Sequence, residues 1–76
     1  MEKELTFGEK ACGVGFNPGG DSSVDNIKRD FAAIIDALHK MRGTMGPEQD
    51  RMLSIAITEA QTAQMWAVKA ITWPHQ

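Results

Sequence analysis

The 76-residue chain has one cysteine, two histidines and no tyrosine. A lone cysteine, Cys12, excludes an internal disulfide framework and a cysteine-based metal site, and it is typical of a reducing compartment. His39 and His75 lie on different parts of the chain, with no cysteine or paired carboxylate motif beside them. The serines lack the strained turn that presents a nucleophilic serine. We therefore expect no catalytic residue, no metal site and no cofactor, and a protein that is not an enzyme.

The chain also lacks a strong charge of one sign and a long apolar run. Its formal net charge is −2, and acidic and basic residues are mixed along it, which argues against binding of DNA or RNA polymers. A small anionic ligand held by one or two cations remains compatible with this charge. No segment approaches the roughly 20 apolar residues of a membrane span, and the N-terminus has no apolar signal-peptide core. We expect a cytosolic protein that does not contact a membrane.

A long helix is predicted over residues 47–73. Pro47 suits the first helical position, because proline there loses only an N–H that would be unpaired anyway. Glu48 and Asp50 place negative charge in the first turn, where the helix dipole favours it. Pro74 then ends the helix.

Two stripes of residues follow this helix at helical spacing. The first alternates three and four residues apart and is mostly alanine: Leu53, Ala56, Ala60, Ala63, Ala67 and Ala70. The second combines aliphatic and amide side chains: Ile57, Gln61, Gln64, Val68 and Ile71. Small residues let another helix approach closely, so the first stripe predicts a tight neighbour. Because residues 63–71 are apolar on most sides and the chain is short, we also predict self-association.

A second helix is predicted over residues 21–42. Its apolar positions form one helical stripe: Val24, Ile27, Phe31, Ile34, Ile35, Leu38 and Met41. Asp21 or Ser22 can cap its start, and Asp36 belongs to the opposite, solvated face. The connection over residues 43–46 is short, so the two helices should lie antiparallel. The predicted fold is all-α, a single domain over residues 1–76 in which an arm and glycine-rich loop, 1–20, precede a helical hairpin.

The N-terminal segment leaves two interpretations open. Residues 1–11 form either one or two helical turns or a frayed tail docked on the hairpin. Residues 12–20 form a loop with four glycines and one proline, and its glycine spacing does not fit a dinucleotide-binding fingerprint. Phe16 either belongs to the core or is presented to a ligand beside Asn17. Lys28 can lean over this loop, and an aromatic ring plus a cation is how small nucleotides are held.

Most of the chain resembles the small phage anti-CBASS sponge proteins of the helical-hairpin family. The resemblance covers the runs FGEKACGVGFNPGGDSSVDNIKRDFAAIID and SIAITEAQTAQMWAVKAITW. Its most specific pieces are residues 15–18 and residues 64–70. The resemblance implies a homohexamer that binds cyclic oligonucleotide second messengers, such as cGAMP, without cleaving them. It thereby implies a block of bacterial immune signalling in the cytoplasm of the infected host.

The resemblance also implies particular site residues. In this family a cyclic dinucleotide is held between protomers by an aromatic residue of the N-terminal loop and a lysine of the first long helix, here Phe16 and Lys28. The aromatic residue is a tyrosine in some relatives, and phenylalanine has no hydroxyl to donate. Asn17 and Arg51 are the residues carried over for a second site, which binds cyclic trinucleotides. The alternative from a different class is a structural or protein-binding hairpin that docks its apolar face on a larger partner.

Overall fold

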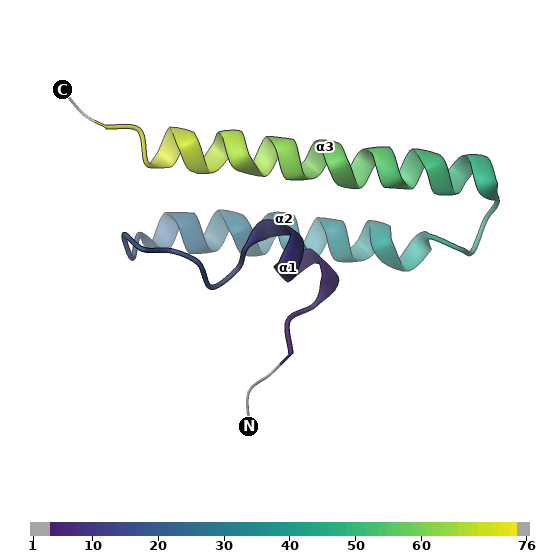
Figure 1. Cartoon of the computed structure of the whole chain (residues 1–76), viewed down its shortest axis with the longest axis horizontal. Helices are drawn as coiled ribbons and strands as arrows, with labels where there is room; N and C mark the ends of the chain where they lie inside the picture. Colours follow the sequence, from purple (N-terminus) through teal and green to yellow (C-terminus); the bar gives the residue numbers. More distant parts are fainter. Residues whose placement is uncertain (1–3, 75–76) are drawn as a thin grey trace.

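The computed structural model of the chain describes residues 4–74, and these form three α-helices without a strand. The helices are α1 (Phe7–Cys12), α2 (Ser22–Met41) and α3 (Pro47–Ile71). Helices α2 and α3 run antiparallel as a hairpin, and α1 packs mainly on α2 (Figure 1). The all-α hairpin is thereby confirmed. Residues 1–3 of the predicted arm, and His75, lie outside the described residues.

Helix α1 decides between the two interpretations of the N-terminal segment in favour of a short helix. Thr6 and Glu9 form a capping box, in which Glu9 N–H donates to Thr6 Oγ1 at 3.1 Å and Thr6 N–H donates to Glu9 Oε1 at 2.8 Å. Gly13 ends the helix with φ 67°, a left-handed conformation that glycine adopts readily. Cys12, predicted as the first loop residue, is the last residue of this helix.

The ends of α2 and α3 follow from local side chains. Of the two predicted caps, Asp21 is the one used, and its carboxylate accepts from Ser23 N–H at 2.8 Å. After α2, Gly43 adopts φ 86° and its N–H donates to Asp50 Oδ1 at 2.8 Å. That bond ties the connection to the first turn of α3 and fixes the hairpin. Helix α3 ends at Ile71, two residues before the predicted end.

The core lies where α1 crosses the hairpin. It contains five buried residues from all three helices and the loop: Cys12, Val14, Ala32, Ile35 and Ile57. Val14 is therefore the loop residue in the core, whereas Phe16 is 72% exposed. The interpretation of Phe16 as a core residue is wrong.

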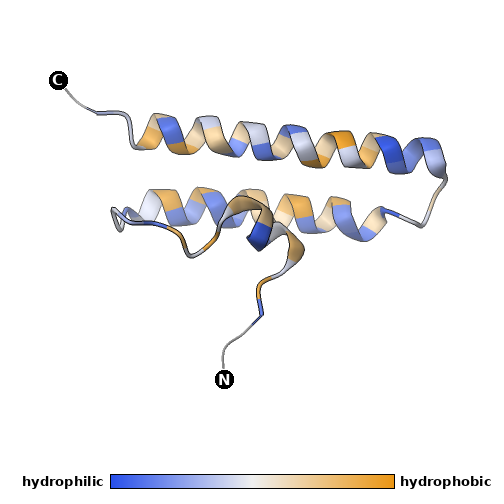
Figure 2. Cartoon of the chain, viewed as in Figure 1, coloured by the Kyte–Doolittle hydropathy of each residue, from blue (hydrophilic) through white to orange (hydrophobic). Residues whose placement is uncertain are grey.

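A close approach between two helices is made at Gly8 of α1, where α1 meets the backbone of α2. A Cβ atom on Gly8 would lie 2.1 Å from the carbonyl oxygen of Ala32. Ala60 packs against the core, but Ala63 and Ala70 are exposed in the chain. The predicted tight neighbour is thus not made at Ala63 by α2. Hydrophobic segments recur along the whole of α3 (Figure 2), and part of them faces solvent.

None of the three helices, over the residues described, combines the length and apolarity needed to cross a membrane.

Candidate ligand-binding site

Lys28 holds the glycine-rich loop against α2. Its side chain is only 7% exposed, and its Nζ donates to the carbonyl oxygens of Gly13, at 3.2 Å, and Phe16. The same Nζ lies 5.5 Å from the centroid of the Phe16 ring, within the range of a cation–π contact. The prediction that Lys28 leans over the loop is confirmed by these contacts.

The loop can turn its carbonyls toward Lys28 because of its glycines. Gly15 and Gly20 have φ values of 98° and 68°, conformations that residues with a side chain rarely adopt. Two tight turns result, with Phe16 N–H donating to Gly13 O and Gly20 N–H donating to Asn17 O, each at 3.0 Å. The chain therefore reverses on both sides of Phe16, which leaves its ring exposed.

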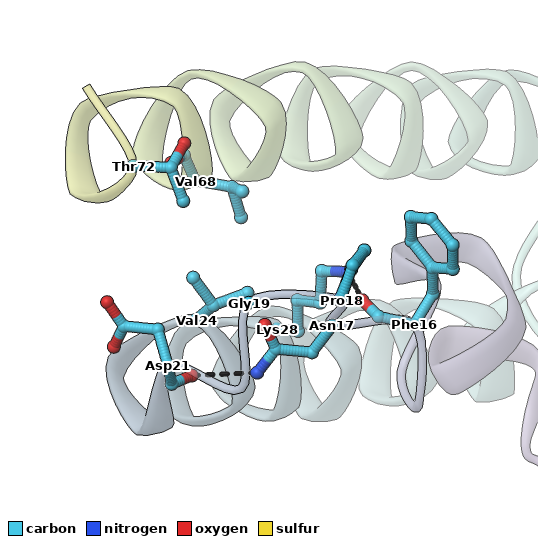
Figure 3. Close-up of a pocket in the computed structure, with 9 residues that line it drawn as sticks. All are labelled: Phe16, Asn17, Pro18, Gly19, Asp21, Val24, Lys28, Val68 and Thr72. Atoms are coloured by element: carbon cyan, nitrogen blue, oxygen red, sulfur yellow. Dashed lines mark hydrogen bonds between the residues drawn. The ribbon is translucent and has the colours of Figure 1, made fainter. Parts of the chain in front are cut away.

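A hollow of about 250 Å³ lies beside this loop (Figure 3). Its lining comes from the loop, the start of α2 and the end of α3: Phe16, Asn17, Pro18, Gly19, Asp21, Val24, Lys28, Val68 and Thr72. Three of the four predicted site residues thus meet at one place. Sequence reasoning missed the wall from α3, because it assigned the neighbouring helix to the alanine stripe and gave the stripe of Ile57 and Val68 no partner.

Asn17 shapes the hollow as well as lining it. Its Nδ2 donates to the backbone oxygen of Asp21 at 2.8 Å, which joins the loop to the N-cap of α2 (Figure 3). Asn17 was carried over for a site separate from that of Phe16 and Lys28. The structure instead brings all three residues to the same hollow.

Arg51 is not part of this hollow. It lies near the start of α3, at the opposite end of the hairpin from the loop (Figure 1). Its Nη2 forms an exposed ion pair with Glu48 Oε2 at 2.6 Å, and its Nε donates to Glu48 Oε1 at 3.1 Å. These hydrogen bonds raise the pKa of Arg51 and lower the pKa of Glu48. Within one chain, Arg51 cannot act together with Asn17.

The chemistry available around the hollow favours binding. It offers a buried ammonium, an exposed aromatic ring and a side-chain amide, which suit an anionic ligand with a flat ring. Cys12 lies nearby in the core, and burial raises the pKa of its thiol, which disfavours the reactive thiolate. Among residues 4–74, no three His, Cys, Asp or Glu side chains gather closely enough to hold a metal ion.

A second hollow, of about 390 Å³, lies on the outer face of α3 and was not predicted. It is lined by Trp66, Lys69, Ala70 and Trp73. The Nζ of Lys69 lies 5.6 Å from the Trp66 ring centroid and 5.8 Å from that of Trp73.

The helices and the loop define a small all-α hairpin with a hollow beside its glycine-rich loop. The chain belongs to the Acb2/Tad1 hairpin domain family, whose model matches residues 10–72. The match spans the loop and both long helices. The family is associated with anti-CBASS sponge function and is a binding family, not a known enzyme family. Comparison of the chain with curated proteins and with solved structures gives no match.

Proposed function

We propose that this protein binds and sequesters cyclic di- and trinucleotide immune messengers without cleaving them. It would thereby block CBASS signalling in the cytoplasm of an infected bacterial host. The observation that carries the proposal is the meeting of the exposed Phe16 ring and the Lys28 ammonium at one hollow, in a chain of this family.

Each of the two residues has a distinct part in binding a cyclic dinucleotide. A base stacks on the ring of Phe16, a contact that contributes about 1–3 kcal/mol by alanine substitution. A lysine ammonium has three N–H donors, and the loop carbonyls of Gly13 and Phe16 accept two of those of Lys28. The remaining N–H is available to a phosphate of the ligand. Because Lys28 is largely shielded from water, this charge-assisted bond is stronger than one on an open surface.

The size of the hollow favours a site completed by a second protomer. Its volume of about 250 Å³ is below the roughly 300–1,000 Å³ of pockets that enclose a drug-sized ligand. A cyclic dinucleotide has two bases and two phosphates related by a pseudo-twofold axis. Two protomers related by a twofold axis can each supply one Phe16 ring and one Lys28 ammonium. The proposed assembly is a homohexamer, which contains such pairs when it is built from three twofold dimers.

The proposed trinucleotide site uses Asn17 and Arg51. Because these residues lie at opposite ends of the hairpin, they can contact one ligand only from different protomers. Asn17 also lines the hollow of Phe16 and Lys28. The variant Asn17→Ala therefore tests whether the two ligand classes use separate sites, since a separate site predicts weaker trinucleotide binding with dinucleotide binding retained.

The central test is calorimetric titration of Phe16→Ala and Lys28→Met with a cyclic dinucleotide. Methionine keeps the apolar stem that fills the site of Lys28 and removes only the charge and its donors. Because each residue acts twice per ligand, we expect each variant to bind at least about a hundredfold more weakly. Lys40→Met, on the exposed face of α2, removes the same charge away from the hollow and should bind as the natural protein does.

The interpretation requires that the variants remain folded, which thermal melting without ligand establishes. Unchanged dinucleotide affinity in a folded Phe16→Ala or Lys28→Met protein would place the site elsewhere. The absence of binding by the natural protein itself would favour the protein-binding alternative.

A further inference from the structure

The outer face of α3 carries a seam in which large and small residues alternate. On the side of α3 away from α2, no other element of the described chain packs against it (Figure 1). Within α3 the seam residues are spaced alternately four and three apart: Met52, Ala56, Glu59, Ala63, Trp66 and Ala70. Trp73 follows just beyond the end of the helix and completes the seam. Met52, Trp66 and Trp73 are 54%, 66% and 60% exposed. This heptad spacing is that of a helix which packs against another helix along its length.

The hollow on this face has a mainly apolar lining and one positively charged side chain. It is lined by Trp66, Ala70 and Trp73, and the Lys69 ammonium lies within cation–π range of both tryptophan rings. Between residues 52 and 71, α3 has only one other charged residue, Glu59. An occupant of the hollow should therefore bring a carboxylate, together with an apolar surface that covers the rings.

We propose that this seam binds the same seam on a second copy of the chain, with the two α3 helices antiparallel. In the proposed register Ala63 faces Trp66 of the second copy, and Ala70 faces its Glu59. The contact specifies the surface that forms part of the assembly proposed above, and it requires no ligand.

The alternation of size favours the antiparallel orientation. In a parallel pair of helices equivalent positions meet, so tryptophan would face tryptophan and alanine would face alanine, which leaves voids beside crowded rings. In an antiparallel pair each large residue faces a small one. Trp66 then covers Ala63, and Trp73 covers Ala56, so that both copies contribute the same surface.

The charges favour this particular register. With Ala70 facing Glu59 of the second copy, that Glu59 enters the hollow between Trp66 and Trp73 and lies beside Lys69. The twofold symmetry makes this pair twice. Because a shift by one heptad in either direction separates Glu59 from Lys69, electrostatic complementarity selects one register out of those that apolar packing allows.

A charge swap tests the contact without ligand. We would measure the mass of the natural protein, Glu59→Lys, Lys69→Glu and the double variant by sedimentation over a range of concentrations. Both side chains are exposed in the chain, so each variant should fold. Each single variant places like charges together twice and should weaken association by about tenfold or more. The double variant restores both pairs and should regain most of the association.

Two further variants separate this contact from a general effect of charge or size. Lys40→Glu makes the same change of charge on the exposed face of α2 and should leave the mass unchanged. Ala63→Leu adds bulk where Trp66 of the second copy packs, and should lower the mass with little effect on the folding of the chain. Single swaps that keep the natural mass, a double variant that does not recover, or a natural protein that stays monomeric would each overturn the proposal. Ligand titration of the same samples tests the proposed function separately.

Discussion

Asp36 fixes the position of α1 with both of its carboxylate oxygens. Its Oδ2 accepts from the hydroxyl of Thr6 at 2.7 Å, and its Oδ1 accepts from Gly8 N–H at 2.6 Å. The hydrogen bond from Thr6 is the main cause that lowers the pKa of Asp36, with further contributions from Gly8 and from the nearby Lys40 and His39. The charged carboxylate thus joins the start of α1 to the middle of α2.

The first prediction is that Asp36 contributes stability which is lost in acid. Because its folded pKa is lower than the ordinary value of 3.8, this contribution is complete above that value and disappears as the pH falls through the folded pKa. Asp36→Asn should lower the free energy of unfolding by roughly 1.5–3 kcal/mol at pH 7, the range for hydrogen bonds to a charged group.

Thermal or denaturant unfolding of both proteins at neutral and acidic pH checks this prediction. The difference in stability should become smaller below about pH 4. A difference that is the same at pH 7 and pH 3 would show that the charge of Asp36 is not what anchors α1.

The contacts of Asp36 with α1 could not be predicted from the sequence. The helical period of α2 correctly assigned Asp36 to the face opposite the apolar stripe, so a solvated side chain was predicted. In the structure α1 contacts Asp36 on that face, and the bond from Gly8 N–H joins residues 28 positions apart in the chain. The apolar period of one helix contains no information about which other element packs against its polar face. Lys28 was predictable, in contrast, because the loop that it contacts directly precedes its own helix.

Gly8 is a point of close approach between α1 and α2. An added Cβ atom would lie 2.1 Å from the Ala32 carbonyl oxygen and 2.9 Å from Asp36 Oδ1. The oxygen of Ala32 belongs to the backbone of α2 and cannot rotate away as a side chain would. Accommodation of any side chain at Gly8 therefore requires α1 to move as a unit.

The second prediction is that Gly8→Ala destabilises the chain and displaces the loop that follows α1. Overpacking of this kind typically costs about 1–3 kcal/mol. Because the loop from Gly13 to Phe16 continues directly from α1, ligand affinity should fall as well. Gly19→Ala is the matched control for stability, since no atom lies within 4 Å of the added Cβ and its φ is ordinary. Equal unfolding midpoints for the two variants would contradict the close approach.

The elements themselves were more predictable than their packing. Proline, aspartate and glycine marked the starts and ends of α2 and α3 to within one or two residues, because caps are local interactions. The alanine stripe predicted a close neighbouring helix, but it did not indicate which of its positions pack against the core. Ala60 does so and Ala63 does not, since that choice depends on how α1 and α2 fill the other side.

As a whole, the described chain is thin, with extents of 49 × 36 × 12 Å. A layer one helix thick buries little apolar surface, and Ile35 is the only large side chain among residues 4–74 that is completely buried. Large apolar side chains of α3 remain exposed, notably Met52, Ile55, Met65, Trp66 and Trp73. Exposed apolar surface on this scale marks an interaction site. It supports the proposed self-association, which was predicted from the length of the chain and the apolar surface of residues 63–71.

The last prediction concerns what happens to a bound nucleotide. The Lys28 ammonium can hold a phosphate and the Phe16 ring can hold a base, whereas cleavage would also need an activated nucleophile with a base to take its proton. Burial raises the pKa of Cys12 and disfavours its thiolate. At a hundred times its Kd, a bound cyclic dinucleotide stabilises the folded state by about 2.7 kcal/mol. We therefore expect the ligand to raise the melting temperature and to be recovered intact.

The measurement combines melting with chromatography of the ligand after heat denaturation. Phe16→Ala should lose the shift in melting temperature, and the recovered nucleotide should be cyclic in both samples. A linear product that increases with the amount of natural protein would show catalysis, because a sequestering protein acts in proportion to its sites and leaves the ligand unchanged. Melting temperature alone cannot make this distinction, since an enzyme with a slow chemical step is stabilised by its substrate in the same way.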